Sequence, residues 1–598
     1  MRLFLPQPAL ECVELLCALR RRFGFIFFKI KSMNTHLINV AEILLSFPLL
    51  LCITLGWGRC IRSIFGVRSH ALFSFDDAWI GLICITLVSE LSHFFIPINW
   101  VLGLEIAILG LAFLLSLGIS RLKIELARTW NFITIHPWIC IAVLLTCMAW
   151  ISRSMDSVNN YDTGLYHLQT IQWLNEHQIV KGLANLHSRF GFNQSYFSFL
   201  ALLNVSPFWL KGYALGNIFL LALAVGTLFS AKFFTRKSGW WLLISLSFAI
   251  GVVAQKIAAP SPDFAIGILQ IVVFIKTIEC LSDDNLGFSQ NIAVLLMLCA
   301  FMLTVKLSSV IYGASMAITV IWVRKIYFKE NLYLLLKTSV VCLAIILVHY
   351  SRGFFLSGFP LYPSLFLGLP NLPWSIPAEK AILEAQWIYS FAKNPLSSPD
   401  LVLGNWGWVK IWIERQSLSL WRFLAIDFAL LIVNFALFMK TASKYEDKKW
   451  LSIYIPLLAS LIFWFLIAPD WRFLGSIPEL IIALAGWLCL RAMNISPKLP
   501  IWANSALNKQ VLGIAIFLMT FRVIHIATLP TDGWQPWPSE KIIQKYTESG
   551  LMIYTPSAGE LCWDAPLPCA AEFNPQLELI PNEKLKTTLG SGFLKKPR

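Results

Sequence analysis

Long apolar runs follow one another along almost the whole chain, and they constrain its fold more than any other feature. Most runs are roughly 15 to 22 residues long, and a helix needs ~20 residues to cross a hydrocarbon core of ~30 Å. Of the 598 residues, 57% are hydrophobic and 14% are charged, which leaves too little polar surface for a soluble protein of this length. A helical bundle is favoured over a barrel, whose strands would alternate over ~10 residues. The sequence therefore predicts an all-α polytopic membrane protein in a lipid bilayer.

The spans can be placed approximately from the apolar runs. We expect about 13–14 transmembrane helices, at about 37–57, 78–96, 99–119, 133–152, 213–232, 239–255, 264–281, 289–305, 310–323, 335–350, 422–440, 451–468, 474–491 and 511–528. Short basic clusters fall on one side when these spans alternate, and the positive-inside rule makes that side cytoplasmic. Because the formal charge of +15 is spread over these clusters and forms no single patch, no nucleic-acid partner is expected.

This topology divides the chain into three parts. Residues 1–32 form a basic N-terminal extension, which is either a poorly ordered segment or precedes the true start at Met33. Residues 33–528 form the transmembrane domain, with outer loops at 153–197 and 351–421. Residues 529–598 form a small polar tail, which lies on the same outer side as the two loops.

The topology also brings a group of charged and polar residues to the outer membrane boundary. They are Asp156, Asp162, His167, Arg189, Asp263, Lys306, Arg352, Asp470 and Arg472. Ionisable groups near hydrocarbon are costly and generally mark function. Acids and cations that converge beside the outer leaflet therefore predict a site for a lipid-borne anion.

The stretch NNYDTGLYHLQ (159–169) contains one acid of this group. Apolar residues at helical spacing predict an amphipathic helix at 164–177 that lies on the membrane. Asp162 precedes this helix, so it either caps the helix or is available for chemistry. Tyr166 and His167 could orient an acceptor hydroxyl beside Asp162, although a single histidine such as His167 is more typical of an ordinary interface residue.

Four basic residues are candidates for binding phosphate, because cations, and the planar fork of arginine in particular, suit that group. They are Arg189, Lys306, Arg352 and Arg472. Arg189 has the alternative role of an interface residue that snorkels to the polar region. In the turn APDWRF almost no loop separates two spans, so Asp470 and Arg472 must both lie at the boundary, where they could instead pair with each other.

The tail contains the only two cysteines that look like a pair, Cys562 and Cys569 in CWDAPLPC, since most of the others lie in or beside apolar runs. An outward-facing compartment would permit a disulfide between them, and the alternative is two unlinked thiols. The chain has no Walker loop, no His/Cys metal spacing and no GxSxG motif. The acidic pairs Asp76/Asp77 and Asp283/Asp284 fall on the cytoplasmic side, so neither a metal nor a cofactor is expected at the outer face.

A lone aspartate just before a helix in the first large outer loop resembles the GT-C superfamily of glycosyltransferases. In more detail, the set YDTGLYHLQ, SPDF, TVKLSS, SGFPLYP, PDWRF and CWDAPLPC is similar to an uncharacterised family of bacterial membrane proteins near that superfamily. The resemblance covers roughly residues 37–598. It implies a GT-C-like bundle in the bacterial inner (plasma) membrane, with an active site that faces the periplasm.

The resemblance further implies a polyprenyl-phosphate-linked sugar as donor and an acceptor on the extracytoplasmic face. Asp162 would act as general base toward the acceptor hydroxyl, with Asp156 as the fallback, while cations hold the departing phosphate. The metal-using branch of the superfamily carries an adjacent acidic pair in this loop, whereas Asp156 and Asp162 are separated in the chain. No metal dependence is therefore expected.

Other functions stay open. A transporter or flippase would also place charges in a helical bundle, although such proteins generally show internal repeats and charges near the bilayer midplane. A polysaccharide polymerase or ligase would share the lipid-linked donor and the outer-face chemistry. A catalytically inactive scaffold is a further alternative.

Overall fold

A computed structural model describes residues 35–595 apart from 66–73, 117–118, 159, 232–237, 283–287, 325–331, most of 419–448, 494–505, 521–536, 539 and 582–587. The predicted basic extension 1–32 and most of the predicted span 422–440 lie outside the described residues. The same holds for Asp283/Asp284 and for the first residues of the predicted tail.

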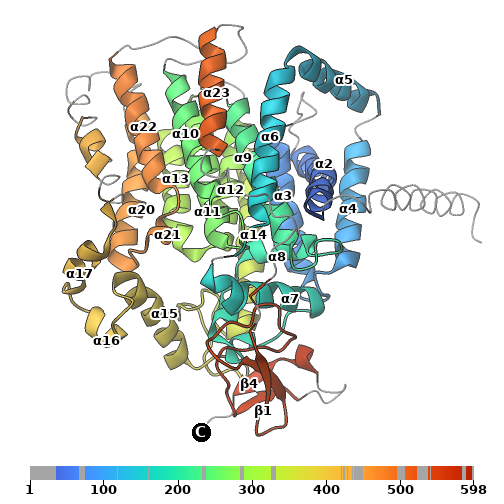
Figure 1. Ribbon diagram of the computed structural model, residues 1–598, viewed down its shortest axis with the longest axis vertical. Coiled ribbons are helices and arrows are strands. Elements are labelled where there is room, and N and C mark those ends of the chain that lie inside the picture. Colours follow the sequence, from blue (N-terminus) through green and yellow to red (C-terminus); the bar gives the residue numbers. More distant parts are fainter. Residues whose placement is uncertain are drawn as a thin grey trace, which may run out of the picture.

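Within the described residues the chain is mostly helical, and most of the long helices run side by side along the long axis of the molecule (Figure 1). In the first half of the chain the helices are α2 (Thr35–Ile64), α3 (Phe75–Ser92), α4 (Trp100–Leu115), α5 (Ile119–Ile135), α6 (Pro137–Ser154), η1 (Thr163–His167), α7 (Leu168–Glu176), η2 (Leu183–Asn185), η3 (Ser188–Gly191), α8 (Ser195–Leu203), α9 (Gly212–Ser230), α10 (Gly239–Ala254) and α11 (Pro262–Ser282). The later helices are α12 (Phe288–Val305), η5 (Leu307–Ser309), α13 (Val310–Val323), α14 (Leu332–Ser357), α15 (Ala378–Lys393), α16 (Pro399–Val402), α17 (Trp408–Arg415), α20 (Tyr454–Ile467), α21 (Trp471–Leu474), α22 (Ile477–Ala492), α23 (Ala506–Thr520) and η7 (Leu589–Ser591). The prediction of a helical fold is confirmed.

Six helical segments among the described residues are long and apolar enough to cross a membrane. They are Leu37–Ile64, Pro137–Ser154, Gly212–Ser230, Pro262–Ser282, Leu332–Ser357 and Lys449–Ile467. Shorter apolar helical segments lie at Trp100–Leu115, Gly239–Ala254, Asn291–Val305, Leu307–Val323 and Val511–Thr520. These segments indicate a membrane protein.

These helices differ in burial, which separates inner helices such as α11 from outer ones. In α11, 94% of the apolar window is buried, whereas the figure is 22% in α2, α6 and α14. The exposed faces of the outer helices carry large apolar side chains, such as Leu45 (69% exposed) and Val340 (66% exposed). An apolar surface of this extent is stable in lipid and costly in water.

Helices α2, α3 and α4 pack with close backbone contact at small residues. A side chain on Gly56 of α2 would collide with the backbone of Gly110 in α4, and one on Gly81 of α3 would collide with the backbone of Thr54. Small residues at helix interfaces allow such close approach, and they are typical of helix packing in membranes.

The two ends of the bundle differ. Helix α5, from the predicted basic loop, lies at one end, whereas α7, α15 to α17 and the strands lie at the other (Figure 1). Helices α15, α16 and α17 occupy the predicted outer loop 351–421, where no helix was predicted from the sequence. The loops of 153–197 and 351–421 and the tail therefore gather at one end of the molecule.

The tail folds as two small antiparallel sheets. Strand β1 (Ile542–Tyr546) pairs with β2 (Met552–Pro556), and β3 (Leu577–Leu579) pairs with β4 (Phe593–Lys595). Phe593 of β4 is fully buried, and its backbone N–H donates a 2.8 Å hydrogen bond to the carbonyl of Lys181. The tail is thereby attached to the loop of 153–197.

Candidate functional site

Asp162 lies between two arginines. Its Oδ1 accepts a hydrogen bond from Nη1 of Arg189 at 2.7 Å, and its Oδ2 accepts one from Nη1 of Arg472 at 3.0 Å. Arg189 lies in η3, and Arg472 lies in α21, 310 positions from Asp162 in the chain. Asp162 directly precedes the π-helix η1, yet within the described residues its carboxylate makes no capping hydrogen bond to that helix. The carboxylate therefore serves in ion pairs and does not cap the helix.

Each of the two arginines also faces a second carboxylate. Nε of Arg189 lies 3.4 Å from Oε1 of Glu384 in α15, and Nε of Arg472 lies 3.4 Å from Oδ2 of Asp470. Asp470 additionally caps α21, because its Oδ1 accepts a hydrogen bond from the backbone N–H of Arg472 at 3.0 Å. The result is a row in which three acids alternate with two arginines.

Both arginines are held in their charged form. Burial alone would lower the pKa of Arg189, but Asp162 and Glu384 outweigh it and raise that pKa. The pKa of Arg472 is likewise raised, since Asp162 and Asp470 outweigh its burial. The side chains of Arg189 and Arg472 are 30% and 37% exposed, and that of Asp162 is 17% exposed, so a ligand can reach the row.

A second ion pair adjoins this row. Lys306, just before η5, pairs with Asp263 in the first turn of α11. Nζ of Lys306 lies 4.3 Å from the centre of the Phe473 ring, and Cζ of Arg472 lies 4.9 Å from the same ring. The ring thus connects the two sets of charges, and Lys256 in the neighbouring turn also acts electrostatically on Asp263.

We refer to these ionised side chains together as the charged cluster: Asp162, Arg189, Asp263, Lys306, Glu384, Asp470 and Arg472. Every cation of the cluster faces at least one carboxylate. An anionic ligand would therefore have to compete with Asp162 for the two arginines.

Tyr166 and His167 form a neutral wall behind the cluster. His167 is buried, its Nδ1 lies 3.4 Å from Oγ1 of Thr163, and burial lowers its pKa to about 4. Burial, with Asp162 as a further cause, raises the pKa of Tyr166 well above its ordinary value. The guanidinium of Arg189 lies 5.9 Å from the centre of the Tyr166 ring. Both side chains support the cluster from inside the protein.

The helix that begins here is buried and does not lie on the membrane surface as the sequence indicated. Almost every residue of 163–175 is buried, and only Thr170 is partly exposed in this range. The helix has two parts, the π-helix η1 and α7, since five residues at its start have the wider π geometry. Such π turns are frequent at functional sites.

Arg352 lies apart from the charged cluster. It is fully buried at the end of α14, where its Nη1 donates to Glu90 at 2.6 Å and to Oγ of Ser198 at 2.9 Å. Glu90, in α3, also lies 2.9 Å from Nδ1 of His349. The structure thus gives Arg352 a buried carboxylate partner, which our sequence analysis missed. An acid near the end of an apolar span is the signal that could have found Glu90.

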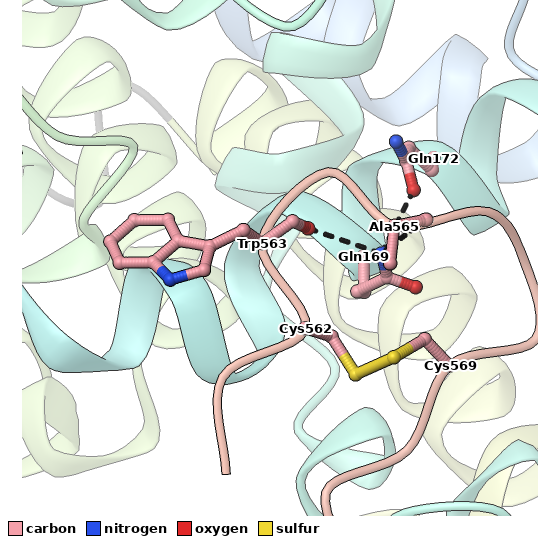
Figure 2. The surroundings of a disulfide bond; sticks show 6 residues. All are labelled: Gln169, Gln172, Cys562, Trp563, Ala565 and Cys569. Carbon is pink, nitrogen blue, oxygen red and sulfur yellow. Dashed lines mark hydrogen bonds between the residues drawn. A yellow bond between two sulfur atoms is a disulfide. The ribbon is translucent and has the colours of Figure 1, made fainter. Parts of the chain in front are cut away.

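The tail contacts the segment that carries Asp162, and Figure 2 shows the part of this contact at Gln169. Nε2 of the buried Gln169 donates hydrogen bonds to the carbonyls of Trp563 at 3.1 Å and Ala565 at 2.7 Å. The backbone N–H of Trp563 donates to the carbonyl of Gly164 at 2.9 Å, and the Trp563 ring fills the space that a side chain at position 164 would need. Tyr161 reaches the same loop through a 2.7 Å hydrogen bond to Glu560. Contacts with the tail therefore lie on both sides of Asp162 in the chain.

A disulfide closes the loop that makes these contacts. Cys562 and Cys569 are bonded, and both are buried (Figure 2). The bond lies directly beside the two carbonyls that Gln169 binds, so it restricts the part of the tail on which the Asp162 segment rests.

The site combines groups from the loop of 153–197, α11, α15 and α21. In the part of the chain that the structure describes, no three His, Cys, Asp or Glu side chains are grouped to hold a metal ion.

Asp156, the fallback base, is ion-paired with Arg153. Glu384 was not among the predicted site residues, because α15 was not predicted.

Comparison with known proteins supplies a family and no activity. Neither the curated proteins nor the solved structures include a match to this chain. Residues 41–477 match a family that is described as a domain of unknown function, and this stretch contains every member of the charged cluster. The chain therefore belongs to the DUF8201 family.

Proposed function

We propose that the protein is a membrane glycosyltransferase, which moves a sugar from a polyprenyl-phosphate donor to an acceptor on the extracytoplasmic face. The observation that carries the proposal is the position of Asp162 between Arg189 and Arg472. At such a place the carboxylate can take a proton, and the two partly exposed arginines can neutralise a phosphate.

The proposed reaction uses these groups in one displacement. The donor phosphate binds the guanidinium groups of Arg189 and Arg472 and displaces the Asp162 carboxylate from them, since the planar forks of arginine suit phosphate oxygens. This frees Asp162 to accept the proton of the acceptor hydroxyl. The acceptor oxygen then forms a bond to the anomeric carbon of the sugar, while the bond from that carbon to the phosphate oxygen breaks. The electron pair leaves with the polyprenyl phosphate, and the arginines stabilise its charge.

The architecture supports the same assignment. We propose a GT-C-like bundle of about 13–14 spans, in which the shorter apolar helices also cross the bilayer. We place it in the bacterial inner membrane with the loop-bearing end toward the periplasm. This orientation agrees with the basic helix α5 at the opposite end and with a disulfide in the tail, because disulfides persist in oxidising compartments.

One observation favours a transporter or flippase as the second candidate. Glu90, His349 and Arg352 form a buried ionic group between α3 and α14. Buried ionisable side chains between membrane helices are also found along ion and substrate pathways. A transporter that moves a lipid-linked sugar would use the same ligand as the proposed enzyme, and its reaction would release no free polyprenyl phosphate.

Binding of undecaprenyl phosphate to the full chain in nanodiscs, followed by native mass spectrometry, tests the phosphate role. Arg472→Ala should weaken binding by roughly tenfold or more, because a charge-assisted hydrogen bond contributes about 1.5–3 kcal/mol. Asp162→Asn should bind the lipid at least as tightly as the wild type, since the competing carboxylate is lost. Asp156→Asn is the matched control and should not change the affinity. Equal affinity in the wild type and Arg472→Ala would contradict the proposal.

A further inference from the structure

A small pocket lies on the far side of Tyr166 from the charged cluster. Its walls are largely aromatic, with Trp173, Phe190, Phe192 and Phe197, and the buried Arg352 also lines it. It has room for a group about the size of a hydroxymethyl. The pocket is thus an apolar slot with a few polar groups, which is typical of small-molecule sites.

Three side chains that line the pocket each carry a buried polar atom without a hydrogen-bond partner among the described residues. These atoms are Nε of Arg352, Nε1 of Trp173 and Oε1 of Gln194. Arg352 and Trp173 are each only 2% exposed. A buried polar atom without a partner costs about 1–3 kcal/mol, so such atoms generally mark a bound water or ligand.

These three atoms define the kind of group that would satisfy them. Arg352 and Trp173 each offer an N–H donor, and Gln194 offers an acceptor. A hydroxyl both donates and accepts, so it matches the set. The charge of Arg352 is already balanced by Glu90 at 2.6 Å, and an anion therefore gains little here. The aromatic walls suit the apolar CH2 part of a hydroxymethyl group.

The pocket is also close to the proposed phosphate site. The Tyr166 ring, over which Arg189 lies, contacts Phe192 at 5.8 Å and Phe197 at 6.3 Å between ring centres. Arg189 and Phe190 are neighbours in η3, one beside the cluster and the other on the pocket wall. One layer of aromatic rings thus separates the cluster from the pocket.

We propose that this pocket binds one hydroxymethyl group of the sugar on the lipid-linked donor, with its hydroxyl between Arg352, Trp173 and Gln194. The inference rests on the proposed function and adds the part of the donor that this pocket recognises. It assigns specificity to Trp173 and Gln194, which no sequence motif singled out.

The test compares three lipids on the full chain in nanodiscs by native mass spectrometry. Bare undecaprenyl phosphate reports the phosphate site, and undecaprenyl-phosphate glucose and mannose report the sugar pocket as well. We expect the wild type to bind at least one of the sugar lipids about fivefold or more tighter than the bare lipid. Trp173→Phe and Gln194→Leu should each reduce this preference and leave the affinity for the bare lipid unchanged.

Gln194→Leu removes an Oε1 that has no described partner, and Trp173→Phe removes the unpartnered Nε1 but keeps an aromatic ring beside His177 and Phe593. Thermal unfolding checks that both variants keep the fold. Trp450→Phe is the matched control, because Trp450 is also buried with an unpartnered Nε1 but packs against Trp487 in α22. It should keep the full preference. A wild type that binds all three lipids equally, or variants that keep the preference, would overturn the sugar pocket and leave the phosphate role intact. No binding of any of the lipids would overturn both proposals.

Discussion

The substitution Gln169→Leu tests whether the tail positions the segment that carries Asp162. In the wild type, Nε2 of Gln169 donates to the carbonyls of Trp563 and Ala565 and to Oε1 of Gln172. Leucine has a similar size, so the main effect is the loss of these donors. Each buried acceptor that loses its partner costs about 1–3 kcal/mol.

The expected size of the effect follows from this balance. Two main-chain carbonyls lose their bond to Gln169, which costs about 3 kcal/mol in total. Oε1 of Gln169 is itself buried without a described partner, so its removal stabilises the closed tail loop by about 1 kcal/mol. The net loss of about 2 kcal/mol corresponds to a roughly thirtyfold rise in the opening of the tail loop.

Hydrogen exchange of the solubilised full chain measures this opening directly. The peptide that contains Trp563 should exchange roughly thirtyfold faster in Gln169→Leu, and peptides of α11 should be unchanged. Gln172→Leu is the matched control, because it removes one side-chain bond on the same helix and keeps both carbonyl bonds. Exchange at Trp563 that is identical in the wild type and Gln169→Leu would refute the positioning role.

Three further predictions concern other parts of the structure. Arg352→Met should destabilise the protein by about 3–5 kcal/mol, because it leaves Glu90 buried without its cation, and adding Glu90→Gln should restore part of the loss in thermal unfolding. The folded-state pKa of His167 is about 4, against an ordinary value of 6.5. Between these pH values the unfolded chain binds more protons than the folded one, so the free energy of unfolding falls as the pH drops through this window. The loss at pH 5 should be about 2 kcal/mol and should disappear in His167→Phe. Cys569→Ser opens a loop with a sequence separation of 7 and should destabilise the tail by about 2.4 kcal/mol, seen as faster proteolysis there and not in the helices. An unchanged stability in Arg352→Met, a pH profile shared by the wild type and His167→Phe, or a tail that resists protease equally would each contradict the corresponding reasoning.

The sequence predicted that several charges converge, because alternating spans fix the end of each helix. Asp162, Arg189 and Arg472 come from distant parts of the chain, and the structure brings them into contact. The apolar runs likewise predicted most of the long helices, since the period and length of such runs depend on local sequence alone.

The features that were not predicted depend on contacts between residues that are distant in the chain, and such contacts leave no local sequence pattern. Arg352 was expected beside the phosphate, but the rotation of α14 turns it toward Glu90, and rotation about a helix axis cannot be read from an apolar run. The helix after Asp162 was expected on the membrane, but the tail covers it through contacts such as Gln169 to Trp563, 394 positions apart. Glu384 lies in α15, a helix in the outer loop that was not predicted from the sequence, so its contact with Arg189 was missed.

The most direct test of the central claim is the lipid content of the host membrane. We would compare cells that carry the wild-type gene, no gene, Asp162→Asn or Asp156→Asn, and measure polyprenyl-phosphate sugars by mass spectrometry. The account predicts that one such lipid accumulates without the gene and with Asp162→Asn, and that the wild type and Asp156→Asn both return it to the normal level. A lipid pool that is the same in all four strains would contradict the proposal that this protein consumes a lipid-linked sugar.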